Sequence, residues 1–125
     1  PTYLNGATTS VHVSGKAYAK PGWALISSFA TNPSRDGSWP WFTNKLFAIE
    51  LTASPRVYGL GYHQVTRYEG YWTEPHAAVN RDFTRLMFNS NWNSSSDTDV
   101  DDYMIEIPAG AIPPVRTSTP ASRNR

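Results

Sequence analysis

The sequence predicts an all-β fold, and three observations lead to this prediction. Aromatic residues make up 14% of the 125 residues, alongside eight glycines and ten prolines. This composition is typical of short strands joined by many turns. No stretch keeps the 3.6-residue periodicity of an amphipathic helix, so we expect almost no helix. Two similar series of short apolar runs follow each other along the chain, which indicates a repeated unit of strands.

Charge and composition exclude several classes of protein. The chain has 11 Lys and Arg against 10 Asp and Glu, a formal net charge of +1. This balance gives no electrostatic reason to expect nucleic acid as a partner. Cysteine is absent, which excludes disulfides and thiolate metal sites. No run approaches the ~18 apolar residues of a membrane helix, so no membrane span is expected.

The first series of strands follows an irregular lead-in, residues 1–10. A short strand is predicted at 11–14 and a longer one at 23–29, with a Lys-Pro-Gly turn at 20–22 between them. The longer run hardly alternates between apolar and polar residues, as expected for a strand with both faces covered.

A long loop, residues 30–44, follows this strand and carries Trp39 and Trp41. Loops of this length are more often functional or disordered than incidental. Two further strands are predicted after the loop, at 45–51 and 56–65.

The second series lies in residues 74–107. Its strands are predicted at the apolar runs 76–79, 86–88 and 103–107. Asn80-Arg81-Asp82 is typical of a tight turn between the first two of these strands. Pro, Ala, Ser, Thr and Arg dominate the end of the chain, and we predict a disordered tail over 109–125.

The two series align with each other in the same order, and the changes in offset fall in loops. The matched positions are 25–28 with 87–90 (offset 62), 47–51 with 103–107 (offset 56), and His12 with His76 (offset 64). Repeats of four short strands over roughly 40–50 residues are typical of β-propeller blades. We therefore predict two four-stranded antiparallel blades of an incomplete β-propeller, over residues 11–66 and 67–108.

Residues 72–107 also carry a family resemblance. The Pro before the first strand, the tight turn, the apolar strand ending at Ser90 and the final Asp-Tyr-Met-Ile-Glu-Ile run together resemble the TolB-type (WD40-like) propeller repeat. Residues 12–51 match it more loosely. The chain departs from the family at its turn, where Asn80-Arg81-Asp82-Phe83 stands in place of Ser-Pro-Asp-Gly. A closed ring needs at least four blades, so the resemblance implies that a longer parent chain or a protein partner supplies the rest.

Histidines are the first candidate site residues. His12 and His76 occupy equivalent repeat positions at the start of the innermost strand, where two imidazoles would converge on a metal or an anionic substrate. His63 is a third candidate. Glu74 precedes His76 by two residues and would act as a base or as the hydrogen-bond partner of an imidazole. The alternative is that these histidines pin strand ends by hydrogen bonds and that Glu74 is solvated.

The resemblance adds a cofactor to this interpretation. TolB-like propellers include oligogalacturonate lyases, which hold a divalent metal, typically manganese, through histidines in the channel. This implies a metal role for His12 and His76, with manganese or calcium as the ion. The carboxylates of residues 97–102 would also suit calcium, although their spacing is not that of an EF-hand, and a solvated acidic loop is the alternative.

Aromatic and glutamate residues complete the candidates. Trp39, Trp41, Tyr71 and Trp72 would form a platform for a carbohydrate, and the alternative is that they fill the core between blades. Glu50 and Glu106 occupy matched repeat positions, which favours a structural role for both.

We expect the chain to be a propeller segment of a larger exported protein, extracellular or periplasmic, that binds a ligand or a protein partner at the channel end of its blades. Two alternatives stay open: the C-terminal part of a metal-dependent pectate-oligomer lyase, as the resemblance implies, and an interaction scaffold without a small-molecule site. No residue is assigned a catalytic role. Imidazoles of His12 and His76 on opposite sides of the blades would exclude a metal, whereas convergence within about 5 Å would allow one.

Overall fold

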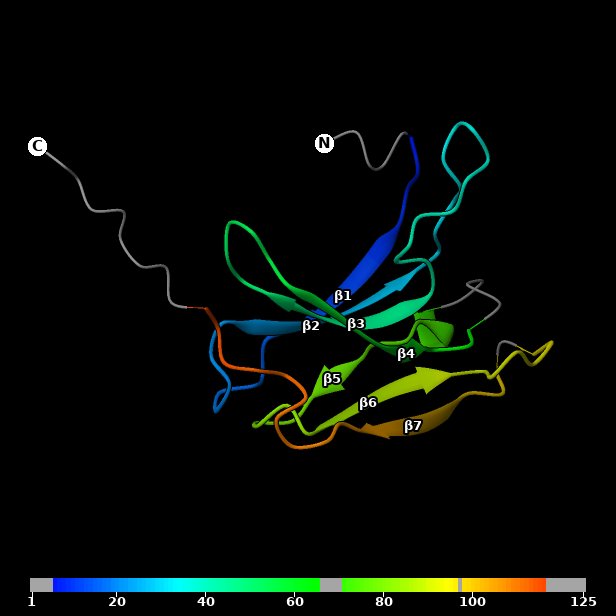
Figure 1. Cartoon of the computed structure of the whole chain (residues 1–125). Coiled ribbons are helices and arrows are strands. Elements are labelled where there is room, and N and C mark those ends of the chain that lie inside the picture. Colours follow the sequence, from blue (N-terminus) through cyan, green and yellow to red (C-terminus); the bar gives the residue numbers. More distant parts are fainter. Residues whose placement is uncertain (1–5, 66–70, 97, 117–125) are drawn as a thin grey trace, which may run out of the picture.

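Two antiparallel sheets lie face to face in the computed structural model, which describes residues 6–65, 71–96 and 98–116 (Figure 1). The first sheet has the order β1 (Ser10–Ser14), β2 (Trp23–Phe29), β3 (Lys45–Glu50), β4 (Val57–Tyr62). The second has the order β5 (Ala78–Val79), β6 (Arg85–Ser90), β7 (Asp101–Glu106). The described helical structure is one short 3-10 turn, η2 (Tyr71–Thr73). The prediction of an all-β fold with almost no helix is therefore confirmed.

Alternation along each strand divides its side chains between an inner face, which looks toward the other sheet, and an outer face. The inner face of the first sheet carries His12, Ser14, Leu25, Ser27, Leu46 and Ala48. The inner face of the second sheet carries Val79, Leu86, Phe88, Tyr103 and Ile105. The apolar members of both sets belong to one core cluster, and burying a side chain such as Leu25 stabilises the fold by about 1.5–3 kcal/mol.

Two inner-face serines also join the sheets by hydrogen bonds. The backbone N–H of Ala77 donates to Ser27 Oγ at 3.4 Å, and that of Val79 donates to Ser14 Oγ at 3.2 Å. These bonds attach the start of the second sheet to the first, so the segment that leads into β5 has a defined position.

The strand pairings of the two sheets follow the sequence repeat. Residues that the offsets match occupy the same cross-strand positions in both sheets. The equivalent pairs are Ser14–Leu25 and Ala78–Met87, Leu25–Ala48 and Met87–Met104, and Ile26–Phe47 and Phe88–Tyr103. The alignment of the two halves thus has a counterpart in the register of their strands.

The second sheet has three strands in the described part of the chain, where the sequence predicted four. After Ile107 the chain returns to the first sheet, and Figure 1 shows this segment running from β7 back toward the turn before β2. Val115 packs against Gly22, and Ile112 is buried. The prolines of this segment lack the N–H groups that a further strand would need. Residues 109–116 of the predicted disordered tail thus contact the first sheet, and 117–125 lie outside the described residues.

A buried carboxylate fastens the returning segment. Arg56 binds both oxygens of Glu50, with its Nε 2.9 Å from Oε2 and its Nη2 2.7 Å from Oε1. Arg116 adds an ion pair at 3.1 Å. The hydrogen bonds from Arg56 hold the pKa of the Glu50 carboxyl far below its ordinary value, against the opposing effect of burial. This position of Glu50 fits the structural role expected from its place in the repeat.

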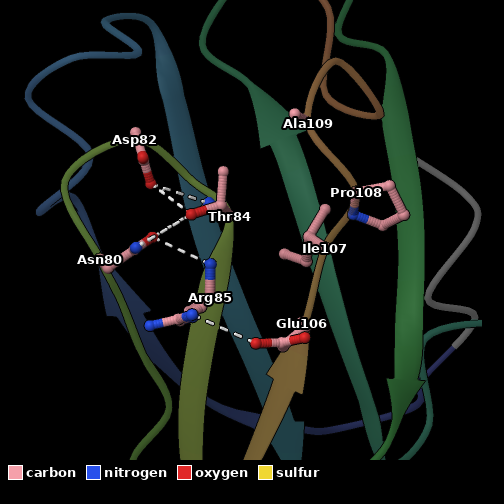
Figure 2. Close-up of a pocket in the computed structure, with 8 residues that line it drawn as sticks. All are labelled: Asn80, Asp82, Thr84, Arg85, Glu106, Ile107, Pro108 and Ala109. Carbon is pink, nitrogen blue, oxygen red and sulfur yellow. Dashed lines mark hydrogen bonds and ion pairs between the residues drawn. The ribbon is translucent and has the colours of Figure 1, made fainter.

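The turn between β5 and β6 is built on side-chain hydrogen bonds (Figure 2). Asn80 Oδ1 accepts from the backbone N–H of Thr84 and of Arg85, each at 3.0 Å. The Thr84 hydroxyl donates to Asp82 Oδ1 at 2.6 Å and lowers the pKa of that carboxyl. Phe83, at the end of this turn, has a φ of 61° and is buried.

A pocket of about 720 Å³ lies beside this turn, and Figure 2 shows the residues that line it. The exposed ion pair between Arg85 and Glu106, at 3.3 Å, lies across it.

Among the described residues, no helix has the length and apolar character needed to cross a membrane.

Candidate metal-binding site at the junction of the sheets

His12 reaches the junction because of its place in β1. Val11 and Val13 on either side of it point to the outer face and are exposed, so the alternation of the strand puts His12 on the inner face. It pairs with Ser27 of β2, and its ring stacks on Phe29 with centroids 4.7 Å apart and planes 10° apart. The stacking limits rotation of the ring and directs its Nε2 edge toward the segment before β5.

Glu74 and His76 come from the short segment between η2 and β5. The carbonyl of Pro75 accepts a hydrogen bond from Asn89 N–H at 2.9 Å, and Ala77 N–H donates to Ser27 of the first sheet. This segment is therefore tied to both sheets. The conformation of residues 74–76 is therefore set by their contacts with the two sheets and not by their own sequence alone.

The backbone of His76 has an unusual conformation. Its φ is 40°, in the left-handed region that costs a non-glycine residue roughly 1–2 kcal/mol. In a regular continuation of β5, residue 76 would share the outer face with Ala78. The positive φ breaks that alternation, and the ring turns inward to meet His12.

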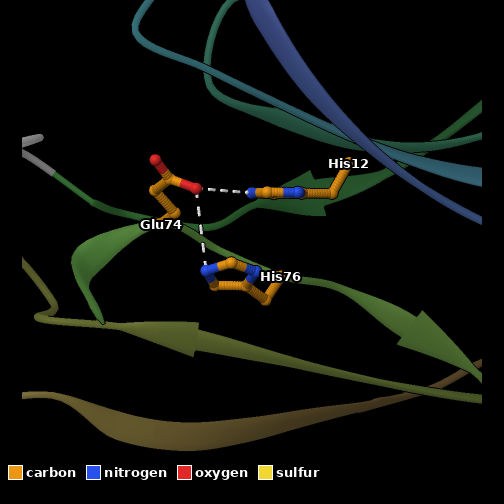
Figure 3. A group of neighbouring side chains, drawn as sticks. All are labelled: His12, Glu74 and His76. Carbon is orange, nitrogen blue, oxygen red and sulfur yellow. Dashed lines mark hydrogen bonds and ion pairs between the residues drawn. The ribbon is translucent and has the colours of Figure 1, made fainter. Parts of the chain in front are cut away.

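Three donor atoms converge as a result (Figure 3). His12 Nε2 lies 2.9 Å from Glu74 Oε2, and His76 Nε2 lies 3.6 Å from the same oxygen. The two imidazoles stack with centroids 4.2 Å apart and planes 27° apart. One ligand atom from each residue lies within 4.8 Å of the others, and no other group of three such side chains does so in the described ranges.

The site is half-buried. The side chains of His12, Glu74 and His76 are 28%, 25% and 23% exposed. A pocket of about 260 Å³ opens beside the two imidazoles, and residues 13–16 and 77–78 complete its lining. The donor atoms are thus sheltered from bulk water and still within reach of a small ligand.

His63 lies apart from this cluster, in the core. Its Nε2–H donates to the Ser28 carbonyl at 2.8 Å, and its Nδ1 accepts from Val65 N–H at 3.1 Å. Burial lowers the pKa of His63, and the bond to Ser28 opposes this only in part. Both ring nitrogens are occupied in the neutral tautomer, so the structure does not bring this candidate to the junction.

Trp39 and Trp41 line a separate cleft of about 350 Å³ at the start of β3 and the end of β4. They are 60% and 54% exposed, so neither is a core residue. Tyr62 and Lys45 complete the cleft, with Lys45 Nζ 5.2 Å from the Tyr62 ring centroid and 5.8 Å from that of Trp41.

Sequence reasoning missed Tyr62 and Lys45. Lys45 directly follows the loop that carries Trp39 and Trp41, and Tyr62 is its cross-strand partner, so this pairing could have identified both residues. Trp72 is exposed on η2 and does not line this cleft. A carbohydrate as the ligand of the cleft stays a prediction.

The acidic loop gives no comparable cluster in the part of the chain that can be described. Asp97 lies outside the described residues, while Asp101 and Asp102 are exposed residues of β7.

No protein-family model, no curated protein and no solved structure matches this chain. The resemblance to TolB-type repeats therefore rests on the residues quoted for it and stays a prediction.

Proposed function

We propose that this chain is a ligand-binding β module in which His12, Glu74 and His76 hold a divalent metal between two propeller-type blades. The convergence of the three donor atoms carries the proposal. Two imidazole nitrogens and one carboxylate oxygen are a ligand set that zinc uses in sites with an open fourth position.

The spacing of the donor atoms suits such an ion. Bonds of about 2.1 Å in a tetrahedral arrangement place neighbouring ligand atoms about 3.4 Å apart. Glu74 Oε2 lies 2.9 Å and 3.6 Å from the two histidine nitrogens, close to this spacing. The stacked imidazoles would tilt apart on metal binding, so that both ring nitrogens point at one ion. The two imidazole donors favour zinc, copper, iron or nickel, and they disfavour calcium and manganese, which prefer oxygen ligands.

The metal would supply a Lewis-acidic position for a donor atom of the ligand, facing the pocket beside the imidazoles. The proposal assigns binding and not catalysis, because Glu74, the carboxylate best placed to act as a base, serves as a ligand. The rest of the pocket lining is backbone and small side chains, apart from Lys16.

The blade interpretation is supported by the shared register of the two sheets and by their face-to-face packing. In a propeller each blade covers a face that its neighbour cannot bury alone. The metal would then join adjacent blades, since His12 belongs to the first sheet while Glu74 and His76 lead into the second.

A structural clamp is the competing interpretation. The bond between His12 and Glu74 at 2.9 Å already ties the sheets together without an ion. The two interpretations differ in what added metal does. A bound metal stabilises the fold in proportion to its occupancy, by about 2.7 kcal/mol at a hundredfold excess over the dissociation constant. A clamp has no such response.

Calorimetric titration of the chelator-treated protein with Zn²⁺, Mn²⁺ and Ca²⁺ tests the proposal, with the visible spectrum of Co²⁺ as a second readout of coordination. We expect one site that binds Zn²⁺ more tightly than Ca²⁺. His12→Ala, His76→Ala and Glu74→Gln should each weaken binding at least about tenfold, equivalent to about 1.4 kcal/mol. Glu106→Gln, an exposed carboxylate on β7, is the matched control. Binding that survives the three substitutions, or no binding at all, would leave only the clamp.

A further inference from the structure

Each sheet also has an outer face, and both outer faces expose apolar side chains. On the second sheet, Met87 and Met104 are 52% and 54% exposed and pair directly with each other. On the first sheet, Val11, Val13 and Val57 are exposed, and Ile26 and Ile49 are half-buried. No described segment covers the outer face of the second sheet. On the first sheet, the loop after β2 covers one end of the outer face, where Trp41 packs on Phe47, and the β1 edge with Val11 and Val13 stays open.

The outer face of the second sheet is equivalent to the inner face of the first. By strand register, Met87 corresponds to Leu25 and Met104 to Ala48. Leu25 and Ala48 are fully buried, because the second sheet covers them. The second sheet therefore presents to solvent the same kind of surface that the first sheet buries.

The converse holds for the outer face of the first sheet. Ile26 corresponds to Phe88 and Ile49 to Ile105, both of which lie on the inner face of the second sheet. Phe88 is buried against the first sheet, and Ile105 packs on the same cluster. The first sheet thus carries, on its outside, apolar residues at the positions by which the second sheet docks.

We propose that copies of this chain associate head to tail, with the outer face of the second sheet of one copy against the outer face of the first sheet of the next. The contact would repeat between molecules the packing that already exists between the two sheets of one molecule. It joins two different surfaces, so it does not end at a dimer and forms a ring or a longer assembly.

The polar residues of the two faces are compatible with this contact. Arg85 and Glu106 neutralise each other beside the methionines, at 3.3 Å. Asp102 leaves one negative charge on that face, and Lys45 gives the outer face of the first sheet a positive one. A second copy is favoured over an unrelated partner because both matching surfaces belong to this chain.

The inference rests on the stacking of the sheets and is independent of the metal, so either proposal can fail alone. Each face exposes only a few large apolar side chains and association carries a large entropic cost, so we expect dissociation constants on the order of 10–100 µM. Sedimentation velocity from about 1 µM to about 1 mM covers that range. The mean mass of the metal-free chain should rise with concentration and pass beyond that of a dimer.

Two single substitutions make the test specific. Met87→Lys places a charge on the outer face of the second sheet, and Val13→Lys places one on the outer face of the first. Each variant alone lacks one of the two surfaces and should stay monomeric. A mixture of both retains one intact surface of each kind and should form a 1:1 dimer that stops there.

Tyr18→Lys adds the same charge at an exposed site on neither face, and it should associate like the unsubstituted chain. Circular dichroism checks that every variant keeps its fold. A chain that stays monomeric throughout overturns the proposal, as does a Met87→Lys variant that still associates alone. A mixture of the two variants that forms no dimer has the same consequence.

Discussion

The imidazoles of His12 and His76 stack at 4.2 Å although 64 positions of sequence separate them. Equivalent residues of two stacked sheets would lie about 10 Å apart, the usual distance between packed sheets. These two meet because His76 leaves the strand alternation with a φ of 40° and turns toward the first sheet. The repeat places the two histidines at matched positions. The departure of His76 from strand geometry then brings the two rings into contact.

This departure also explains what sequence reasoning could and could not predict about the site. The repeat identified His12, His76 and the nearby Glu74, because side-chain types and spacing are visible in the sequence. The left-handed backbone conformation of His76 could not be predicted, because a histidine in the sequence does not indicate a positive φ. His63 is a candidate by its chemistry and its place beside a predicted strand, whereas its burial follows from contacts distant in sequence, with Ser28 above all.

The strands of the fold were easier to predict than the course of the end of the chain. Trp23–Phe29 reads as a strand because its apolar run is bounded by turn residues. Residues 109–116 read as disordered because their composition is rich in Pro and Ala. Their position depends instead on two individual contacts, Val115 on Gly22 and Arg116 on Glu50, which composition cannot indicate.

The first prediction concerns Phe83, which combines a buried ring with a φ of 61°. Removing a buried phenylalanine ring costs about 3–5 kcal/mol, whereas the left-handed conformation costs a non-glycine residue about 1–2 kcal/mol. Burial is the larger effect, so Phe83→Gly should be less stable than the unsubstituted chain. It should nevertheless be more stable than Phe83→Ala, by about 1 kcal/mol, because glycine relieves the backbone. Urea unfolding measures the order, and equal stability of the two variants would contradict it.

The second prediction concerns pH and follows from the lowered pKa of His63. Above pH ~6.5, the ordinary value for histidine, the ring is neutral in both the folded and the unfolded chain. As pH falls below ~6.5, the unfolded chain takes up the proton more readily, so the free energy of unfolding should decrease, by at most about 1.4 kcal/mol per pH unit. The carboxyls with lowered pKa, Glu50 and Asp82, add their own loss only as pH falls below ~4.5.

Urea midpoints at several pH values between ~7.5 and ~5 measure this effect within the histidine window. A variant carrying His12→Gln and His76→Gln should keep the slope, because His63 is then the only histidine of the chain and its buried position is unchanged. A midpoint that is constant over this range in the double variant would show that His63 is not the cause.

The third prediction uses two glycines with nearly the same backbone and different surroundings. Gly22 has a φ of 82°, and a Cβ there would lie 2.5 Å from Val115 Cγ2. Gly37 has a φ of 81° and no atom within 4 Å of that position. Gly37→Ala therefore measures the backbone cost alone, about 1 kcal/mol. Gly22→Ala should cost more, since it also displaces the segment that carries Val115.

Val115→Ala separates the two contributions at Gly22, because it removes the methyl group that the new Cβ would meet. The double variant Gly22→Ala, Val115→Ala should be more stable than the sum of the single effects predicts, by about 1 kcal/mol. The same Val115→Ala change should show no coupling with Gly37→Ala. Additive effects in the first pair would mean that residues 109–116 do not dock on the first sheet in solution. Gly22 would then contribute through its backbone conformation alone.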